Sequence, residues 1–396
     1  MSKLKDLLNK LCSDGVEFIK LDKCLSYEQP TKYIVKCKDY IETGLPVLTA
    51  GQTFILGYTD ETEGVFNASK DNPVIIFDDF TTSFHWVDFD FKIKSSAMKM
   101  LRPRADMNIS FRFVYYAMKC IKYQTLEHSR QWISKYSQLE IPLPPIEVQN
   151  EIVRILDCFT QLEAELEAEL DCRKRQYEFY RDQLLGFDKL TPPERNNVVW
   201  MPITEVFEMR NGYTPSKNKP EYWEGGKIPW FRMEDIRQNG RILSDSIQHI
   251  TMDGVKKGNL FKANSFILAT TATIGEHALV IADSLANQQF TNLSVRKSLK
   301  DRIIIKFLFH YMFIIDDWCK NNVNISGFAS VDMNKFKKLE IPIPPIEEQN
   351  RIVAILDRFE SLTTSLQHGL PAEIAARRQQ YEYYRDKLLD FKRKTA

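Results

Sequence analysis

The sequence reads LEIPLPPIEVQNEIVRILDCF at residues 139–159 and LEIPIPPIEEQNRIVAILDRF at residues 339–359. Each block is followed by a second repeated block, which reads RKRQYEFYRDQLLGF up to Phe187 and RRQQYEYYRDKLLDF up to Phe391. The copies are offset by 200 residues in the first block and by 204 in the second. The later copy has therefore gained four residues, in a stretch that contains HGLP at 368–371. A repeat of this kind predicts a doubled architecture.

Each copy predicts a long helix with a marked start. Pro145 and Pro345 suit the first helical position. Glu147 and Glu347 stand in the first turn, where a carboxylate interacts favourably with the helix dipole. In the first copy we expect a helix of about 42 residues, which at 1.5 Å per residue is roughly 60 Å long.

An apolar seam follows both predicted helices in steps of three and four residues. Such a seam suits packing against another helix, so we expect an antiparallel, coiled-coil-like pair. The four added residues act as a stutter that keeps the seam on one side, while Pro371 is expected to break or kink the second helix. The seam, which is also the candidate partner-binding surface, comprises Ile155, Phe159, Leu162, Leu166, Leu170, Tyr177 and Tyr180 in the first copy, and Ile355, Phe359, Leu362, Leu366, Tyr381 and Tyr384 in the second.

The remaining sequence predicts two globular segments rich in short β-type runs, among them PVIIFDDF, WVDFDFKI and SFILATTATI. TPPERNN, after the first helix, has the composition of a linker. The expected fold is α/β (mixed α+β), with globular domains at residues 1–145 and 191–345. Two long antiparallel helices, within residues 146–190 and 346–396, separate the domains and give the chain an internal pseudo-two-fold repeat.

The composition is that of an ordinary soluble protein. Of 396 residues, 43% are hydrophobic and 27% charged, and the formal net charge is +1. No apolar run approaches the length of a membrane span, and the N-terminus lacks a secretory signal, so we expect a cytoplasmic protein without membrane contact. Seven cysteines without a C-x-x-C pair suggest reduced thiols and no structural zinc.

No enzyme signature is apparent, since the sequence contains no P-loop, no G-x-S-x-G, no H-E-x-x-H and no [DN]-P-P-[YF]. The most suggestive cluster is Asp88, Asp90 and Lys92, because D-x-K on a strand is typical of metal-dependent nucleases. Simple alternation explains the same residues as the solvent face of a strand, with Phe89 and Phe91 on its core face. Both interpretations stay open, and we predict no catalytic residue and no metal site.

Several turn-rich segments hold candidate DNA contacts, in which short polar and basic side chains meet phosphates and a few residues meet base edges. Ordinary surface turns have the same composition. The candidates are Lys32, Gln52, Thr81, Thr82, Lys94 and Ser95 in the first domain, and Thr214, Ser216, Lys217 and Arg232 in the second.

Two faintly similar globular segments, each followed by a nearly copied helix that opens IPxPPIExQNxIVxILDxF and closes RxxQYxxYRDxLL, resemble the specificity subunit of a type I restriction-modification system. The resemblance covers the whole chain. The Leu-Glu-Ala-Glu quartets at residues 162–169 are similar to those of the branch called type IC. The added residues at 368–371 depart from a perfect duplicate.

The resemblance implies a non-catalytic DNA reader. Such a subunit binds double-stranded DNA, two adenine-N6 methyltransferase (M) subunits and two restriction-translocase (R) subunits. Each globular domain would read one half of a split target. S-adenosylmethionine, ATP and Mg²⁺ would be held by the partners, with no cofactor on this chain. Two alternatives from other classes are a nuclease that uses Asp88, Asp90 and Lys92, and a helical scaffold that does not bind DNA.

Overall fold

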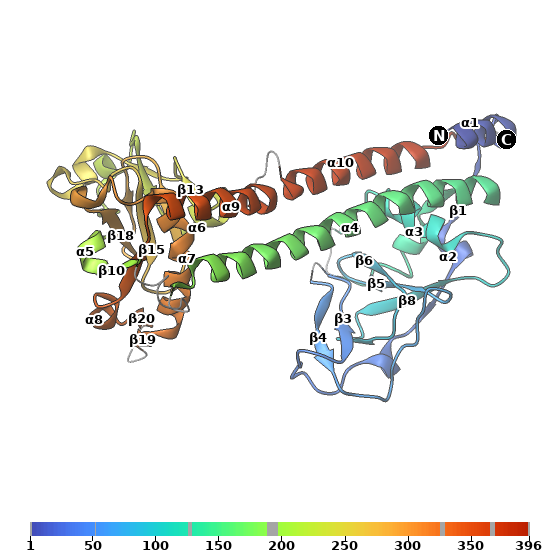
Figure 1. Cartoon of the computed structure of the whole chain (residues 1–396). Helices are drawn as coiled ribbons and strands as arrows, with labels where there is room; N and C mark the ends of the chain where they lie inside the picture. The colour runs from blue at the N-terminus through green and yellow to red at the C-terminus, as the bar shows by residue number, and fades with distance from the viewer. Residues whose placement is uncertain are drawn as a thin grey trace. The chain divides into compact units, whose positions relative to one another are not determined.

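The computed structural model describes residues 2–51, 53–125, 129–187, 197–324, 329–364 and 369–394. The chain divides into two compact units, Met1–Glu165 with Ala375–Ala396 (unit 1) and Leu166–Ile374 (unit 2). Each unit combines a β-rich body with parts of the long helices (Figure 1). No helix in the described ranges has both the length and the apolar character needed to cross a membrane.

Unit 1 contains one antiparallel strand pair, β1–β9, and two small sheets with strand orders β2-β8-β5-β6 and β4-β3-β7. Its elements are α1 (Ser2–Leu11), β1 (Glu17–Lys20), α2 (Leu21–Cys24), β2 (Leu25–Glu28), β3 (Leu45–Leu48), β4 (Ile55–Thr59), β5 (Val74–Asp78), β6 (Phe84–Val87), β7 (Lys92–Ile93), β8 (Met98–Pro103), α3 (Phe111–Lys119) and β9 (Glu140–Leu143).

Unit 2 contains the pairs β10–β21 and β19–β20 and the sheets β11-β18-β15-β16-β13 and β14-β12-β17. Its elements are β10 (Val199–Pro202), α5 (Ile203–Val206), β11 (Phe207–Asn211), β12 (Ile228–Phe231), α6 (Met233–Asn239), β13 (Ile242–Leu243), β14 (His249–Ile250), β15 (Ser265–Ala269), β16 (His277–Val280), β17 (Leu285–Ala286), β18 (Phe290–Val295), α7 (Ile305–Asn321), β19 (Val323–Asn324), β20 (Ser330–Val331), α8 (Met333–Phe336) and β21 (Glu340–Ile343).

The two units share one topology although their β-rich sequences are only faintly similar. The antiparallel order β2-β8-β5-β6 is repeated as β11-β18-β15-β16, and the pair β1–β9 is repeated as β10–β21. Both units contain an equivalent parallel pair, β7 with β3 and β17 with β12, and in unit 2 the short strand β13 also pairs in parallel with β16. The structure therefore confirms a mixed α/β fold with an internal repeat, and it extends the repeat from the helices to the β-rich bodies.

The first long helix, α4 (Ile146–Leu185), begins one residue after Pro145, which was expected at the first helical position, and ends two residues before Phe187. The second copy forms two helices, α9 (Ile346–Thr364) and α10 (Leu370–Leu389). Gly369 is non-helical, and its carbonyl accepts the first amides of α10, so the expected interruption near Pro371 is confirmed. Pro371 lies in the first turn of α10, where its missing N–H costs little. Most of the proposed linker lies outside the described residues.

The helices pack antiparallel within each unit. In unit 1, Phe159 of α4 stacks on Tyr384 of α10 with ring centres 5.5 Å apart, and Glu163 pairs with Arg378 at 2.6 Å. In unit 2, Tyr180 of α4 stacks on Phe359 of α9 at 5.3 Å. The two stacks join equivalent positions of the repeat.

The remaining seam residues fall on the same helices. Tyr177 donates toward His310 of α7, and Tyr381 lies against Tyr116 of α3. Leu366 lies outside the described residues. Leu362 is exposed. The other residues that the sequence placed on the seam are half-buried, namely Ile155, Leu162, Leu166, Leu170 and Ile355.

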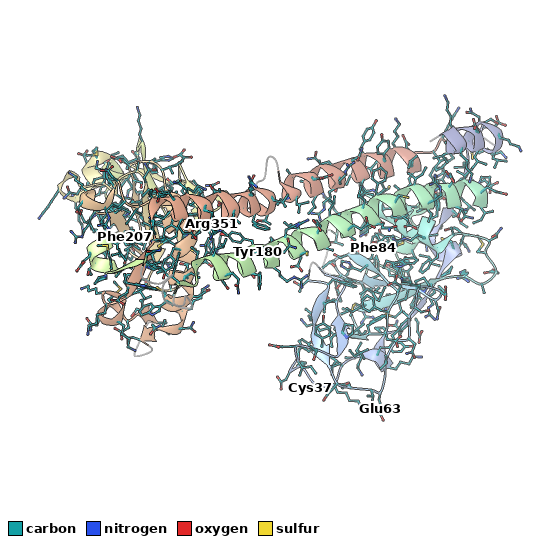
Figure 2. All side chains as sticks on the ribbon, in the orientation of Figure 1. Cys37, Glu63, Phe84, Tyr180, Phe207 and Arg351 are labelled. Atoms are coloured by element: carbon teal, nitrogen blue, oxygen red, sulfur yellow. The ribbon has the colours of Figure 1, made fainter. Side chains whose placement is uncertain are left out.

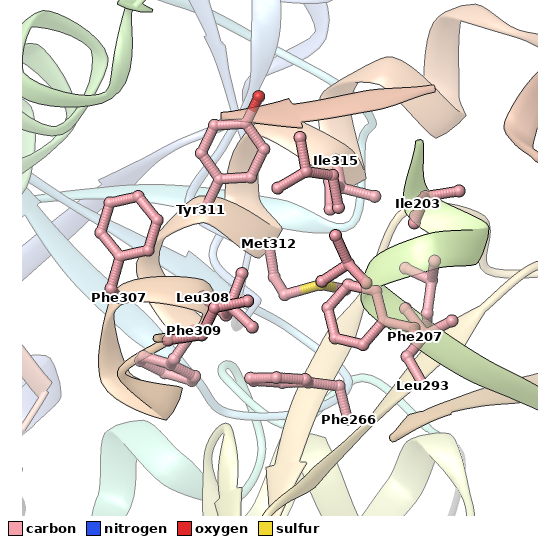
Figure 3. Close-up of a cluster of buried hydrophobic side chains, with 14 of the residues drawn as sticks. Ile203, Phe207, Phe266, Leu293, Phe307, Leu308, Phe309, Tyr311, Met312 and Ile315 are labelled. Atoms are coloured by element: carbon pink, nitrogen blue, oxygen red, sulfur yellow. The ribbon is translucent and has the colours of Figure 1, made fainter. Parts of the chain in front are cut away.

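In each unit one hydrophobic core lies between a β-sheet and the helices that cover it, and a second core is built mostly from strand residues. In unit 2, Phe207 and Phe266 of the sheet meet Phe307 and Met312 of α7 (Figure 3). The same core takes in the end of α4 and the start of α9. In unit 1 the start of α4 and the end of α10 close the core in the same way.

Two strand predictions were wrong in part. The run WVDFDFKI is interrupted after Val87, and Phe89 is 36% exposed rather than buried. Lys92, expected in water, is buried. In SFILATTATI the strand stops at Ala269, and the following residues form a turn in which Ala272 has a φ of 62°. Simple alternation fails here because these short strands lie at the junction of two sheets, so neither face is solvent.

A buried glutamine anchors the start of each long helix. Gln149 accepts a hydrogen bond from the Ser110 amide (2.9 Å) and donates one to the Pro144 carbonyl (2.8 Å). Gln349 repeats this arrangement, accepting from the Ile304 amide and donating to the Pro344 carbonyl, both at 2.8 Å. Both side chains are fully buried, so each supplies partners to backbone groups that water cannot reach.

Replacing Gln149 by Ala should destabilise the chain, because it leaves a buried N–H and a buried C=O unpaired, at about 1–3 kcal/mol each. We expect the thermal unfolding midpoint, followed by circular dichroism, to fall by about 5 °C or more. Gln161→Ala is the matched control, since Gln161 is exposed and bonds only Glu165. Equal midpoints for the two variants would contradict the anchoring role.

Candidate nucleic-acid interface

The polar loops of unit 1 gather at one end of its β-rich body. Strands β2 and β5 both run antiparallel to β8, so their carboxyl ends lie beside the start of β8. The Asp79 amide donates to the Ala97 carbonyl (2.8 Å), and the Lys94 amide donates to the Leu48 carbonyl (3.1 Å). The loops that follow β2, β3, β5 and β7 therefore form one surface. We call it loop surface 1, and it comprises residues 29–33, 49–51, 79–83 and 94–97.

Unit 2 builds the equivalent surface from the equivalent strands. The Thr270 amide donates to the Gln289 carbonyl (2.9 Å), and the Asn287 amide donates to the Phe231 carbonyl (3.0 Å). These bonds join the turn after β15, the segment before β18 and the end of β12. Loop surface 2 comprises residues 212–217, 232–235, 270–276 and 287–289.

The structure brings Thr81, Thr82, Lys94 and Ser95 together on loop surface 1. Thr81 and Lys94 are exposed, and Thr82 and Ser95 are half-buried. Thr82 has a φ of 60°, which a β-branched residue rarely adopts. Its amide donates to the Asp78 carbonyl (3.0 Å), which holds the turn in this conformation. The four side chains lie on adjoining loops, as a joint contact to DNA requires.

Lys32 also lies on loop surface 1, but its charge is already paired. Its Nζ lies 2.7 Å from Glu28 Oε1 and 5.0 Å from the centre of the Tyr33 ring. The hydrogen bond with Glu28 raises the pKa of Lys32 to about 12, so the side chain is a cation at neutral pH. A DNA phosphate would compete with Glu28 for this cation. Gln52, the remaining candidate of this domain, lies outside the described residues.

Three candidates of the second domain follow β11 on loop surface 2. Ser216 and Lys217 are exposed, and Thr214 is half-buried. The Thr214 hydroxyl donates to Gln288 Oε1 (2.6 Å), which ties this loop to the segment before β18. The indole of Trp223 donates to the Ser216 carbonyl (3.0 Å) and fixes the turn from inside.

Arg232, the fourth candidate, opens helix α6 directly after β12. Its amide donates to the Asp235 carboxylate (2.7 Å), which caps the helix. Its guanidinium lies 3.1 Å from Glu234 and 5.9 Å from the ring centre of Trp230, with 31% of the side chain exposed. The ion pair and the aromatic ring hold the side chain at the rim of the loop surface.

The sequence analysis missed residues 287–289, which read NQQ and lie at the centre of loop surface 2. They occupy the position that Lys94 and Ser95 occupy in unit 1, between the parallel strand and the next antiparallel strand. Asparagine and glutamine side chains are well suited to pair with adenine. A strand-by-strand alignment of the two domains would have revealed them. The short strands differ too much in sequence for that alignment to be made without the structure.

The structure does not bring Asp88, Asp90 and Lys92 together as a metal site. Asp90 accepts hydrogen bonds from the Asn67 side chain (3.2 Å) and the Ala68 amide (3.1 Å). Lys92 is buried, pairs with Glu61 at 2.8 Å and donates to the Glu63 carbonyl at 2.6 Å. Asp90 and Lys92 thus have structural partners, and the D-x-K pattern was misleading because the strand breaks between its members.

Within the described part of the chain, one group has metal-ligand geometry, namely His310, Asp357 and Glu360. The ammonium group of Lys306 lies 3.5 Å from Asp357 and 3.3 Å from Glu360, where it already neutralises the carboxylates. At the equivalent place in unit 1, Arg112 forms an ion pair with Asp157 and the Tyr116 hydroxyl donates a hydrogen bond to it. The group is therefore a polar tie between two helices that recurs in both units.

The comparison with protein families agrees with this doubled arrangement. The family described as type I restriction modification DNA specificity domain matches the chain twice, at residues 13–171 and 196–376. The chain belongs to this family. It is a specificity subunit of a type I restriction-modification system.

Relatives cover the chain from end to end. The specificity subunit of the type I restriction enzyme EcoR124I/EcoR124II from Escherichia coli is 44% identical over 99% of this chain and 98% of its own length. A putative type I specificity subunit from Haemophilus influenzae is 28% identical over 99% of this chain and 100% of its own. The crystal structure of an S subunit from M. genitalium matches 95% of this chain and 96% of its own, with a TM-score of 0.53 at 14% identity. That structural match supports the fold alone.

The pairing of Lys92 with Glu61 predicts that the stability of the fold depends on pH. The contact with Lys92 lowers the pKa of Glu61 to about 2, below its usual value of 4.5. A carboxylate whose pKa is depressed by folding stabilises the protein above its unfolded pKa, and this stability is lost as the pH falls toward the folded pKa. Glu61→Gln should lower the thermal midpoint at pH 7, and the difference from wild type should shrink between about pH 5 and pH 2.

The matched control is Glu63→Gln, because the Glu63 side chain is 87% exposed and its carboxylate pairs with the exposed Lys36. We expect this variant to follow the wild type at each pH. A Glu61→Gln midpoint that stays equally far below wild type at acidic pH would rule out the ion pair as its cause.

Proposed function

We propose that this specificity subunit reads a bipartite double-stranded DNA target, with loop surface 1 on one half-site and loop surface 2 on the other. The observation that carries the proposal is the repetition of the loop surfaces. Two β-rich bodies of equivalent topology each gather short polar residues at the same end of the sheets. Side chains on rigid strand ends are suited to contact base edges and phosphates.

The DNA contacts proposed here are Lys32, Thr81, Thr82, Lys94, Ser95, Thr214, Ser216, Lys217 and Arg232, together with the missed residues 287–289. Basic residues are few among them, and the chain as a whole has a net charge of +1. Since phosphate contacts supply most non-specific DNA affinity, much of the affinity should come from partner subunits.

The chain itself is proposed to be non-catalytic, and to direct methylation and restriction by two M and two R subunits. Those partners would hold S-adenosylmethionine, ATP and Mg²⁺. An internally doubled surface suits two copies of one partner.

Phe179 of α4 and Tyr383 of α10 are equivalent positions of the repeat, and each is 60% exposed. Each ring packs edge-on against the next residue, Tyr180 at 5.5 Å and Tyr384 at 5.3 Å. Tyr180 lies toward the carboxyl end of α4 (Figure 2).

The central test is exchange of one domain. Residues 195–340 are replaced by the corresponding segment of a relative with a different target, and the variant is produced together with its partner subunits. Methylome sequencing should show a new sequence in one half of the target and the original sequence in the other, because each body has its own core.

Exchange of residues 1–138 is the reciprocal control and should alter only the other half. A change in both halves after either exchange would refute independent reading. Absence of any sequence-selective methylation by the wild-type complex would refute the DNA-reading function and leave a scaffold, while cleavage by the purified chain alone with Mg²⁺ would favour the nuclease.

The exposed aromatic pair tests the partner stoichiometry. Phe179→Ser should remove one of two bound M subunits, and the double variant Phe179→Ser, Tyr383→Ser should remove both, since large exposed aromatics dominate many interfaces. Native mass spectrometry measures the number bound. Glu178→Ala with Glu382→Ala is the matched control on the adjacent positions. Full occupancy in the double aromatic variant would contradict these docking positions.

A further inference from the structure

A buried ion pair lies directly beneath loop surface 1, and Gln29, an exposed residue of that surface, completes a polar triad with it. Lys99, on β8, and Asp79, in the β5–β6 turn, are both 0% exposed, and their Nζ and Oδ2 atoms are 3.4 Å apart. The same ammonium donates to Gln29 Oε1 at 3.1 Å. The Oδ1 atom of Asp79 accepts from the amides of Gln131 (3.1 Å) and Trp132 (2.7 Å). Water has no access to the ion pair, so the protein alone sets its geometry.

The three residues come from three different loops of the surface. Gln29 begins the loop that follows β2, and Asp79 is the first residue of the turn that carries Thr81 and Thr82. Lys99 follows the segment that carries Lys94 and Ser95. The triad therefore ties together, from below, loops whose outer residues are proposed to contact DNA.

Strand register identifies the equivalent positions in unit 2. In unit 1, Lys99 pairs with Phe77 on β5, and Asp79 lies two residues further on. In unit 2, Thr291 pairs with Leu268 on β15, and Thr270 lies two residues further on. On the neighbouring strand of unit 2, Asn211 pairs with Thr291. On the neighbouring strand of unit 1, Glu28 pairs with Met100, so the next residue, Gln29, follows in register toward Lys99. The three positions thus correspond one to one.

Unit 2 fills these positions with neutral groups that make the same connections. The hydroxyls of Thr270 and Thr291 lie 3.1 Å apart, which replaces the ion pair. The Thr291 hydroxyl lies 3.1 Å from Asn211 Oδ1, which replaces the bond from Lys99 to Gln29. Even the backbone bond from residue 79 to residue 97 recurs, from Thr270 to Gln289. A charged triad is therefore unnecessary for the fold, because the same fold forms with an uncharged one.

We propose that Lys99, Asp79 and Gln29 are positioning residues that set half-site specificity in unit 1, and that Thr291, Thr270 and Asn211 do the same in unit 2. This inference rests on the proposed DNA-reading function. Burying an ion pair costs desolvation, so such a pair is better suited to fix one geometry than to add stability. Lys99 and the threonines differ in length and charge, so two bodies of one topology hold their equivalent loops with different side chains.

The test uses the full chain in complex with its M subunits and duplexes with single-base substitutions in either half-site. Lys99→Met removes the charge and leaves Asp79 unpaired. We expect methylation of the intact target to fall on the order of tenfold to a hundredfold, as for displaced binding groups generally. Discrimination against substitutions should fall in the half-site read by unit 1 and stay unchanged in the other. Thr291→Val should produce the opposite pattern.

The triple variant Gln29→Asn, Asp79→Thr, Lys99→Thr, which copies unit 2, should bind M subunits and recover discrimination relative to Lys99→Met. If Lys99→Met does not fold, the triple variant alone decides. A folded triple variant that is selective for the half-site of unit 1 supports the proposal, and a folded one without that selectivity contradicts it. A folded Lys99→Met with wild-type discrimination in both halves, or equal loss in both halves, would overturn the proposal. A wild-type complex that methylates no defined sequence would instead refute the DNA-reading function.

Discussion

The structure depends on one constraint, which is that each of the two repeated helical segments buries its start in one unit and its end in the other. Helix α4 begins in the core of unit 1 with Val148 and Ile152 and ends in the core of unit 2 with Leu185. The second copy starts in the core of unit 2 with Ile352, and its last helix returns to unit 1 with Leu389. Each core is thus incomplete without a helix end contributed by the other repeat. The nearly copied helix sequences follow from this reciprocity, because each end must fit the same kind of site.

The helices were predictable from sequence because their signals are local and strong. Proline at the first helical position, an acidic first turn and a long apolar seam agree with one another, and the sequence of the second copy repeats all three. The interruption near Pro371 followed from the same reasoning. The buried glutamines at the helix starts were not predictable, since their role depends on backbone groups of Ser110 and Ile304 that are distant in sequence.

The β-rich bodies were less predictable, for two physical reasons. Their strands are short, two to six residues, so alternation is sampled over too few positions to identify a face. Several also lie between two sheets, which explains why Lys92 is buried, while Phe89 is exposed because it lies in the irregular segment between β6 and β7. The candidate DNA residues were found where turn composition pointed to them. Residues 287–289 were missed because only the strand register reveals that they are equivalent to the loop of Lys94.

The comparison of equivalent positions shows how one topology accommodates different chemistry. At the helix contact, Arg112 and Tyr116 of unit 1 correspond to Lys306 and His310 of unit 2, and each pair binds an aspartate of the long helix. A buried polar group must be satisfied, but the identity of its partner is free as long as the hydrogen bond is made. Substitution at such sites must therefore be concerted, because a change in one partner alone leaves a buried group unpaired. The helix sequences, in contrast, must stay alike, since both copies must fit equivalent cores. This difference explains why the repeat is close in the helices and faint in the bodies, where coordinated changes can alter the loop surfaces and leave the connections between the strands intact.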